Sequence, residues 1–399
     1  GNLAAGRGVF ASAALNSSFC YINNVKIYIV FNGSYGFNFP LDDSSQWYNI
    51  ILTCNGSTLT CYVNGVSRGT SSVAMGDFNS AVAHTIGSYN GDESHFDGYM
   101  ADFVFVDGAV HSTSVFGQTD TSTNRWIPKD PTITLDEASD FGNNGFYLNF
   151  ADSSALGDDI SGNNHDFTNN NTVTQSTDSP TTNFNTYDPN ESSGTFKTGN
   201  TISLAGNNSI NIGTIPLRSG KWVFEATGTT ASLSAHFVGV AGPLMPTGNG
   251  GTQGGLSDGY MLQNDANLFI DGVDSGANAS ATWTTNDVIR CEIDRDNHTL
   301  QWFKNGSSIL SITNVYDKNW RTCTSYATFM ATTMNSGATA FAQTPTTGFI
   351  AISQDNMAGT DQFISAFSWI KNRDATDNHM LFDRVRGVTK DLHSNDTTI

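Results

Sequence analysis

The sequence predicts an all-β protein that contains two β-sandwich units in tandem. Residues 47–66, WYNIILTCNGSTLTCYVNGV, and residues 287–309, DVIRCEIDRDNHTLQWFKNGSSI, share one pattern: two alternating strands joined by a polar turn, followed by an Asn-Gly turn. Strict alternation indicates a strand with one buried face, and Asn-Gly is a strong turn signal. Because helical periodicity is missing, we expect helix in fewer than roughly 10% of residues, well below the average of globular proteins.

The composition narrows the classes of protein to consider. Hydrophobic residues make up 38% of the chain, charged residues make up only 14%, and there are 39 glycines. Low charge with many small polar residues is typical of extracellular all-β proteins and of viral fibres. The net charge of −19 repels phosphate backbones, so we expect no nucleic-acid partner. No apolar run approaches the roughly 20 residues that span a bilayer, so we expect no membrane insertion.

The two ends of the sequence do not look like the ends of complete domains. The chain begins GNLAAGRGVF, without a Met and without a basic and apolar leader. It ends LHSNDTTI, in which no strand or helix closes a domain. We therefore expect an internal segment of a longer polypeptide.

The five cysteines give no evidence of a metal centre. Cys20, Cys54, Cys61, Cys291 and Cys323 form no CxxC pair, which argues against a zinc ribbon. Cys54 and Cys61 flank one hairpin turn, and whether they face each other depends on a strand register that the sequence leaves open. The simpler interpretation is five buried free thiols that act as small hydrophobic residues.

The first unit is expected to cover residues 1–117. Its expected strands are 25–31, 47–54, 58–63, 84–88 and 99–106. The sequence HSTSVFG then predicts one short helical turn, with Ser112 or Thr113 as its cap. Residues 118–140 are expected to form a connector, in which Trp126 and Ile127 pack against a neighbouring domain.

The second unit is expected to cover residues 141–348 and to begin with strand 145–150 and an Asp/Asn-rich loop. Its further strands are expected at 221–226, 236–241, 259–263, 267–270, 288–294, 299–304, 326–332 and 338–342. The Gly-rich residues 248–259 lack the following helix and the Lys-Ser/Thr pair of a phosphate-binding loop, so they predict a surface loop. Residues 349–399, with an apolar strand at 363–370, are expected to start a third domain that the end of the chain truncates.

Both units carry sequence phrases of known sandwich families. The first resembles laminin G-like domains in WYNIILTCNGSTLTCYVNG (47–65), HTIGSY (84–89) and GYMADFVFVDGAV (98–110), although the first strands of that fold are not recognisable. The second is similar to SPRY domains in GKWVFEAT (220–227), HFVGVAG (236–242), NDVIRCEIDRDNHTLQWFKNG (286–306) and FMATTMNSGATAFA (329–342). The resemblance implies tandem concanavalin A-like β-sandwiches, or jelly rolls, and a truncated third segment.

The order of the phrases resembles long structural proteins of tailed bacteriophages. They are FGNNGFYLNFADSSALGDDISGNNHDF (141–167), DSPTTNF (178–184), the SPRY-like unit and FSWIKNRDATDNHMLFDRVRG (367–387). The resemblance implies a virion protein at the outer surface of the particle, as a tail fibre, an appendage or a capsid decoration. The partners that it implies are other virion subunits in a homo-oligomer, with a trimer favoured, and a host surface glycan.

A non-enzymatic role is the leading interpretation, with a bacterial surface adhesin and a glycan-degrading depolymerase as alternatives. The segment CEIDRD (291–296) places Glu292, Asp294 and Asp296 on one face of a strand, which is similar to the carboxylate strand of laminarinase-type glycoside hydrolases. Here the third member is Asp rather than Glu, and the following NHTLQWFKNG fits a hairpin with the aspartates at its turn. We therefore expect no catalytic residues.

Two loop regions are candidate glycan contacts, because aromatic rings stack on sugars and amides bind hydroxyls. Tyr89, His95 and Tyr99 lie near one loop, and Tyr260 and Asn264 lie near another. The alternative for each aromatic residue on a strand is a position in the core.

Two acidic loops are candidate Ca²⁺ sites, because Ca²⁺ is bound by six to eight oxygen ligands. One contains Asp92, Glu93 and Asp97, and the other contains Asp152, Asp158 and Asp159. The alternative is that these side chains bind nearby backbone in Asx-type turns. We expect no other cofactor.

Overall fold

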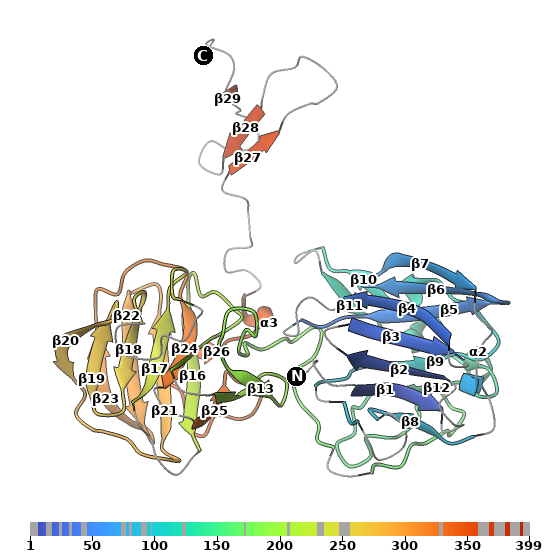
Figure 1. Ribbon diagram of the computed structural model, residues 1–399, viewed down its shortest axis with the longest axis horizontal. Helices are drawn as coiled ribbons and strands as arrows, with labels where there is room; N and C mark the ends of the chain where they lie inside the picture. The colour runs from blue at the N-terminus through green and yellow to red at the C-terminus, as the bar shows by residue number, and fades with distance from the viewer. Residues whose placement is uncertain are drawn as a thin grey trace.

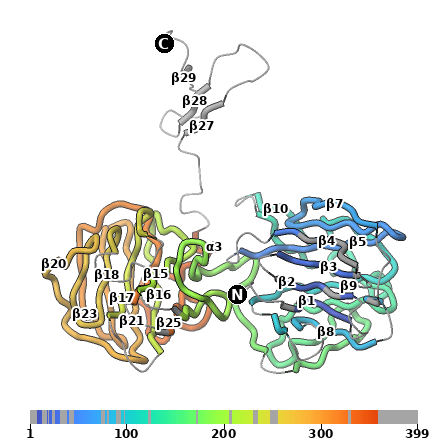
Figure 2. The backbone as a smooth tube through the Cα atoms, in the orientation of Figure 1, coloured from blue at the N-terminus to red at the C-terminus, as the bar shows by residue number. Residues whose placement is uncertain are grey.

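The computed structural model describes residues 7–12, 18–23, 26–31, 34–40, 46–72, 77–79, 82–88, 94–96, 98–121, 125–170, 173–205, 208–229, 235–246, 256–326, 330–357, 367–370, 380–383 and 392–393. It is 44% strand and 6% helix, which confirms the all-β prediction. Two β-sandwiches follow each other along the chain (Figure 1). Figure 2 traces the path of the backbone through them.

The first sandwich has a five-stranded antiparallel sheet as one layer. Its strands are, in spatial order, β4 (Ser34–Pro40), β3 (Lys26–Phe31), β2 (Ser18–Asn23), β1 (Arg7–Ser12) and β8 (His84–Ile86). Alternate residues of these strands, such as Phe10, Ile22 and Ile27, are buried in the core. The sequence prediction missed β1, β2 and β4, although the Asn32-Gly33 dipeptide between β3 and β4 is a strong turn signal.

The opposite layer of the first sandwich consists of two separate pieces. One is the sheet β5 (Ile50–Asn55), β6 (Thr58–Val63) and β7 (Val66–Ser72), and the other is the pair β9 (Phe103–Phe105) and β12 (Phe146–Leu148). Both pieces lie behind the five-stranded sheet (Figure 1) and share its apolar core. Within the described residues, no backbone hydrogen bond joins β5 to β9, so each of these strands keeps one unpaired edge.

The chain between the two expected units belongs to the first sandwich. Phe146 pairs with Phe105 and Leu148 pairs with Phe103, and the Phe146 ring lies 4.9 Å from that of Phe167. The expected boundary at residue 141 therefore differs from the structure. The apolar pattern of 145–150 indicates a strand correctly, but only the tertiary fold decides that its partner is β9.

The expected connector is also folded onto the first sandwich. Its elements are α1 (Thr113–Phe116), β10 (Gly117–Thr119), β11 (Trp126–Pro128), η2 (Pro131–Ile133) and α2 (Ala138–Phe141). Ser112 is the N-cap of α1, as expected. The Trp126 ring packs so closely on Gly65 and Gly117 that a Cβ at either glycine would overlap it. Trp126 is thus an anchor, as the sequence predicted, and it anchors the chain to the first sandwich.

The second sandwich has two large sheets. One contains β13 (Thr195–Lys197), β14 (Ile202–Ala205), β25 (Met330–Asn335), β16 (Lys221–Gly228), β21 (Val288–Asp294), β22 (Thr299–Lys304) and β23 (Ser307–Ile312), with β26 (Ile350–Ala351) parallel to β16. The other contains β15 (Ser209–Ile212), β24 (Arg321–Tyr326), β17 (His236–Ala241), β18 (Gly259–Gln263), β19 (Asn267–Ile270) and β20 (Val273–Asn278).

A buried tryptophan core joins these two sheets. Trp222, Trp283, Trp302 and Trp320 are all essentially inaccessible to solvent. The indole N–H of Trp302 on β22 donates a hydrogen bond of 2.9 Å to the carbonyl of Val238 on β17, so it links one sheet to the other.

Of the eight strands expected from residue 221 onward, five match their bounds, the strand expected at 221–226 extends to Gly228, and two differ. The expected strand 326–332 is divided between β24 and β25, and no strand forms at 338–342. Instead, the backbone N–H groups of Ala342 and Gln343 donate to the buried Glu225 carboxylate. A buried charge therefore fixes a loop where the alternating sequence had suggested a strand.

The remaining described elements are η1 (Asp77–Asn79), α3 (Gln354–Met357) and the three-stranded sheet β27 (Phe367–Ile370), β28 (Met380–Asp383) and β29 (Leu392–His393). In the described part of the chain, no helix has the length and apolar character that a membrane span requires.

Candidate functional site

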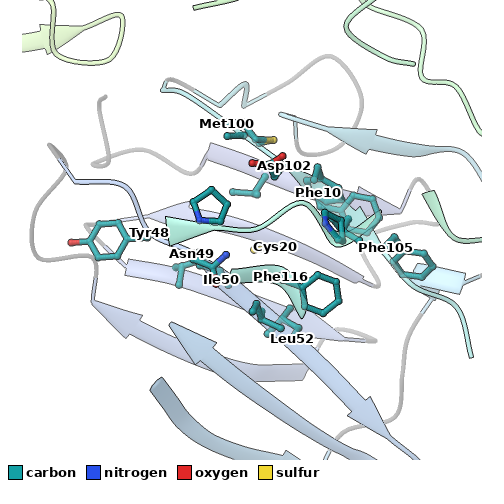
Figure 3. A pocket seen from close by; sticks show the side chains of 18 of the residues that line it. Phe10, Cys20, Tyr48, Asn49, Ile50, Leu52, Met100, Asp102, Phe105 and Phe116 are labelled. Carbon is teal, nitrogen blue, oxygen red and sulfur yellow. The ribbon is translucent and has the colours of Figure 1, made fainter. Parts of the chain in front are cut away.

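A cavity of about 930 Å³ in the first sandwich is the candidate functional site (Figure 3). Its floor is the inner face of the five-stranded sheet, from which Phe10, Cys20 and Ile27 line it. Residues 46–56 and 98–111 line it without interruption. A sheet face would contribute alternate residues, so unbroken runs indicate that the edges of β5 and β9 bound the space. The cavity exists because these two edges do not pair.

Aromatic rings form much of the cavity wall. Tyr48, Phe105 and Phe116 are among the lining residues that Figure 3 labels, and Trp47 and Tyr99 line the cavity as well. The rings of Trp47 and Tyr99 stack with a centroid separation of 6.2 Å and an interplanar angle of 22°. Flat apolar rings with a few placed polar groups are the usual lining of a small-molecule site.

Asp102 is a cavity-lining carboxylate that a hydrogen bond holds in place. It is the residue directly before β9, and its backbone adopts the left-handed conformation with φ of 51°. Its Oδ1 accepts a hydrogen bond of 2.7 Å from the Tyr147 hydroxyl, and no described protein group binds its second oxygen. Burial raises the pKa of Asp102, and the hydrogen bond from Tyr147 opposes that rise.

Three residues that line the cavity each have one buried polar atom without a hydrogen-bond partner among the described residues. The three atoms are Oδ1 of Asn49, Nε2 of His111 and Nε1 of Trp126. A buried polar atom without a partner costs free energy, about 1–3 kcal/mol for a neutral group. These atoms face packed protein rather than the open cavity, as Nε1 of Trp126 does against Gly117.

The cavity reaches the junction between the two sandwiches. Asp178, Asn183 and Gly199 also line it. The indole N–H of Trp47 donates to Oδ1 of Asp178 over 3.4 Å, and the hydroxyl of Tyr99 donates to the carbonyl of Thr198 over 3.4 Å. Burial raises the pKa of Asp178 to about 6.

Gly199 gives a direct test of this junction. Its φ is 58°, and a Cβ would overlap the Tyr99 ring. We expect Gly199→Ala to separate the junction while both sandwiches stay folded, seen as faster proteolysis between them and a larger radius of gyration in X-ray scattering. Gly56→Ala is the matched control, because Gly56 has φ of 60° with nothing near its Cβ position. It should cost only the backbone strain of about 1–2 kcal/mol. Equal behaviour of the two variants would contradict the packing role of Gly199.

The candidate glycan residues lie in different environments. Tyr99 lines the cavity, and His95 is exposed, whereas Tyr89 lies outside the described residues. Tyr260 is only 3% exposed and packs edge-on against Trp320, with ring centroids 5.5 Å apart. Asn264 accepts a hydrogen bond from the backbone of His236 through its side chain. Tyr260 is therefore a core residue rather than a glycan contact, because its alternating position faces the interior of the sandwich.

Hydrogen bonds from nearby backbone and hydroxyl groups to aspartate side chains stabilise the acidic loop that contains Asp152, Asp158 and Asp159. Asp152 accepts from the backbone N–H and the hydroxyl of Ser154. Asp159 is buried and accepts from three backbone N–H groups and one hydroxyl, whereas Asp158 is exposed. The described residues contain no group of three or more His, Cys, Asp or Glu side chains that could hold a metal ion. The Ca²⁺ hypothesis for this loop thus finds no ligand set. The other candidates, Asp92, Glu93 and Asp97, lie outside the described residues.

The carboxylates of CEIDRD all have structural partners. Glu292 is buried, accepts a hydrogen bond of 2.7 Å from the Thr346 N–H, and lies 3.2 Å from Nε of Arg290. Asp294 forms an ion pair of 3.0 Å with Lys221. Asp296 accepts from the N–H of Gly220.

We expect Glu292→Gln to leave unchanged any glycan hydrolysis that the protein shows. The variant should unfold more easily, by about 1–3 kcal/mol, because it removes a charge beside buried Arg290. Release of reducing sugar from a polysaccharide panel and urea unfolding measure the two effects. A selective loss of hydrolysis in a folded variant would support the depolymerase alternative.

The strand register also resolves the cysteine question. Cys61 pairs with Leu52 and Cys54 pairs with Leu59, so the two thiols are not opposite each other. All five cysteines are free, and all except the partly exposed Cys54 are buried.

Three family models match parts of the chain. Residues 9–116 match the concanavalin A-like lectin/glucanases superfamily, residues 221–344 match the SPRY domain, and residues 348–399 match a domain of unknown function, DUF7483. The chain therefore combines a region similar to laminin G-like domains with a region similar to SPRY domains. This composition is that of a carbohydrate-binding or protein-interaction module.

Several solved structures are similar to part of the chain. The SPRY domain of human HERC1 has 18% identity, covers 39% of this chain and 99% of its own, and gives a TM-score of 0.34. Stonustoxin has 11% identity, with 38% and 27% covered and a TM-score of 0.32. The PSpry domain of TRIM65 has 12% identity, with 38% and 92% covered and a TM-score of 0.31. No curated protein matches this chain.

Proposed function

We propose that this chain is a non-enzymatic binding component on the surface of a tailed-phage virion, as a fibre, an appendage or a capsid decoration. The observation that carries the proposal is the cavity beside the junction, which is lined by aromatic rings and by the Asp102 carboxylate. The carboxylates of the most enzyme-like strand are used to hold loops, which supports binding rather than hydrolysis. The order of sequence phrases shared with phage structural proteins supports the virion location.

The proposal includes contact with a host surface glycan and with other subunits. The first sandwich would supply the glycan contact, because its cavity contains the aromatic and amide groups. A homo-oligomer, with a trimer favoured, would place several copies of this site on one particle. Several simultaneous contacts raise the overall strength of attachment without any new contact within a site.

Particle fractionation and electron microscopy test the location. Antibodies against the purified chain should label intact virions at one structural position, and mass measurement should give a defined oligomer. Labelling of the bacterial surface in uninfected cells would favour the adhesin alternative. Sugar release from host polysaccharide by the purified chain would favour the depolymerase alternative.

A further inference from the structure

We propose that Asn55 is a site of spontaneous deamidation and that it loses its amide before the other Asn-Gly sites of the described chain. The four Asn-Gly dipeptides within the described residues are Asn55-Gly56, Asn64-Gly65, Asn144-Gly145 and Asn305-Gly306. The same dipeptide reacts similarly in an unfolded chain, so the fold decides which of the four reacts first. The inference goes beyond the proposed function and does not depend on it, because the reaction needs only this chain and water.

The reaction replaces the side-chain amide of Asn with a carboxylate. The backbone nitrogen of the following residue loses its proton and attacks the Asn Cγ, a new C–N bond forms, and the side-chain nitrogen takes up a proton and leaves as ammonia. Water then opens the cyclic imide at one of its two carbonyls, which gives either Asp or isoaspartate. Gly is the most favourable following residue, since it has no Cβ to obstruct the attack and the greatest backbone freedom. Ring closure therefore requires an amide side chain that can rotate and a Gly nitrogen that is not held in a hydrogen bond.

At Asn55 both reacting groups are unrestrained. Asn55 is the last residue of β5, and it pairs with Thr58 across a two-residue turn. It is exposed, and no described group forms a hydrogen bond with its side-chain amide. Gly56, the first turn residue, has φ of 60° and no atom within 4 Å of its Cβ position. The Cys54 thiol donates to the Gly56 carbonyl, and the Gly56 N–H donates to no described group. The Asn55 amide can therefore rotate towards a free nitrogen.

At Asn305 three hydrogen bonds hold the same two groups. Its Oδ1 accepts from the Val288 N–H over 2.9 Å, and its Nδ2 donates to Oδ1 of Asp287 over 2.6 Å. The N–H of Gly306 donates to Oε1 of Gln343 over 2.8 Å. The Asn305 residue is nevertheless exposed, so hydrogen bonding rather than access to water distinguishes this site from the first one.

At Asn64 the side chain and the backbone of the turn are both fixed. Oδ1 of Asn64 accepts a hydrogen bond of 2.8 Å from the Asn49 N–H. The Trp126 ring lies so close to Gly65 that a Cβ at this glycine would overlap it. Ring closure moves the backbone of the turn, so this packing opposes the reaction in addition to the hydrogen bond.

The Asn144 amide is bound by two side chains. Its Nδ2 donates over 2.8 Å to Oδ1 of Asn79 and over 3.1 Å to Oδ2 of Asp107. The N–H of Gly145 donates to the carbonyl of Gly142 over 3.3 Å. The reaction at this site, as at the two preceding ones, must therefore first break local hydrogen bonds, which raises its barrier.

Deamidation at Asn55 changes the candidate site. Asn55 and Gly56 line the cavity. The described lining already contains three aspartates and one lysine, namely Asp102, Asp107, Asp178 and Lys129. The new carboxylate is ionised at neutral pH, since an ordinary Asp side chain has a pKa of about 3.9. Either product thus makes the cavity lining more acidic, and isoaspartate also lengthens the main chain beside a turn that sets the register of β5 and β6.

Peptide mass spectrometry of the full chain, incubated in mildly alkaline buffer, tests the proposal. One sample stays folded and a second is unfolded in guanidinium chloride, and incubation continues until the unfolded sample has lost half of its Asn-Gly amides. In the folded sample we expect Asn55 to react at least about tenfold faster than the other three described sites, because each of these must break one or more hydrogen bonds. In the unfolded sample we expect similar rates at all four.

Two variants assign the signal. Asn55→Gln has a longer side chain whose ring closure is much slower, so the mass change of its peptide should disappear while the other sites keep their rates. Asp287→Ala frees Nδ2 of Asn305 and removes only a partly exposed ion pair, so the fold should persist. We expect this variant to speed the reaction at Asn305 several-fold and to leave the rate at Asn55 unchanged.

Two outcomes would overturn the proposal. One is an Asn55 amide that stays intact in the folded sample, and the other is equally fast loss at any of the other three described sites. An unchanged rate at Asn305 in folded Asp287→Ala would show that hydrogen bonds do not set the order of reaction. None of these results depends on where the chain is located, so the inference and the virion proposal fail independently.

Discussion

Replacing Arg290 by alanine is expected to destabilise the second sandwich by about 3–5 kcal/mol. Arg290 is 3% exposed and lies directly across the sheet from Glu225, two residues before Glu292 on the same strand. Its Nε is 3.2 Å from Glu292 Oε1, although the N–H does not point along a hydrogen bond to it. Its guanidinium also stacks on Phe303 at 3.8 Å and donates to the carbonyl of Thr344.

The large effect arises because the variant would leave two buried carboxylates without their cation. Glu225 and Glu292 together bind the backbone N–H groups of Ala342, Gln343 and Thr346, and Arg290 binds the carbonyl of Thr344, so the loop that follows β25 would lose one of its contacts as well. Urea unfolding followed by tryptophan fluorescence measures the loss. Lys304→Ala is the control, because its ion pair with Asp287 is partly exposed and should contribute about 0–1 kcal/mol. A similar small loss in both variants would show that the buried cluster is not a major source of stability.

Lowering the pH from 7 to 4 is expected to tighten the junction between the two sandwiches. The Asp178 carboxyl is 7% exposed, and burial raises its pKa from 3.8 to about 6, although hydrogen bonds from Trp47 and Phe184 oppose that rise. A raised pKa means that the docked form binds the proton more tightly than an undocked, solvated form. The stabilisation of the docked form is therefore complete below about pH 4 and is lost as the pH rises through about 6. The maximum change is about 3 kcal/mol.

X-ray scattering and protease sensitivity between pH 4 and 7 measure the docking equilibrium. We expect a smaller radius of gyration and slower cleavage between the sandwiches at the acidic end. Asp178→Asn should remain docked at both pH values, because it keeps an acceptor for Trp47 without a charge. Asp152→Asn is the control, since Asp152 lies on an exposed turn within the first sandwich. Persistence of the same pH response in Asp178→Asn would assign it to another group.

Few of the residues that line the candidate site could be predicted from the sequence. Among the described candidate glycan residues, Tyr99 alone lines it. Asn49, Asp102, His111 and Trp126 carry no local signal, because neither their spacing nor their neighbours resemble a known ligand motif. They come together only because the edges of β5 and β9 remain unpaired on either side of one space. The acidic loops were predicted as Ca²⁺ sites from their composition. In the described loop, however, carboxylate oxygens of Asp152 and Asp159 accept hydrogen bonds from nearby backbone N–H groups.

The sequence by itself determined the all-β class, the tandem arrangement and the hairpins with alternating residues. Strands such as β6, β17 and β21 were predictable to the residue, because alternation and Asn-Gly turns are local properties of the chain. Only the tertiary structure decided that β12 pairs with β9, that Glu225 and Glu292 hold a loop, and that Tyr260 belongs to the core. Strand pairing, burial of charge and the shape of a cavity depend on contacts between residues far apart in the sequence. Local sequence patterns do not specify which distant residues form those contacts.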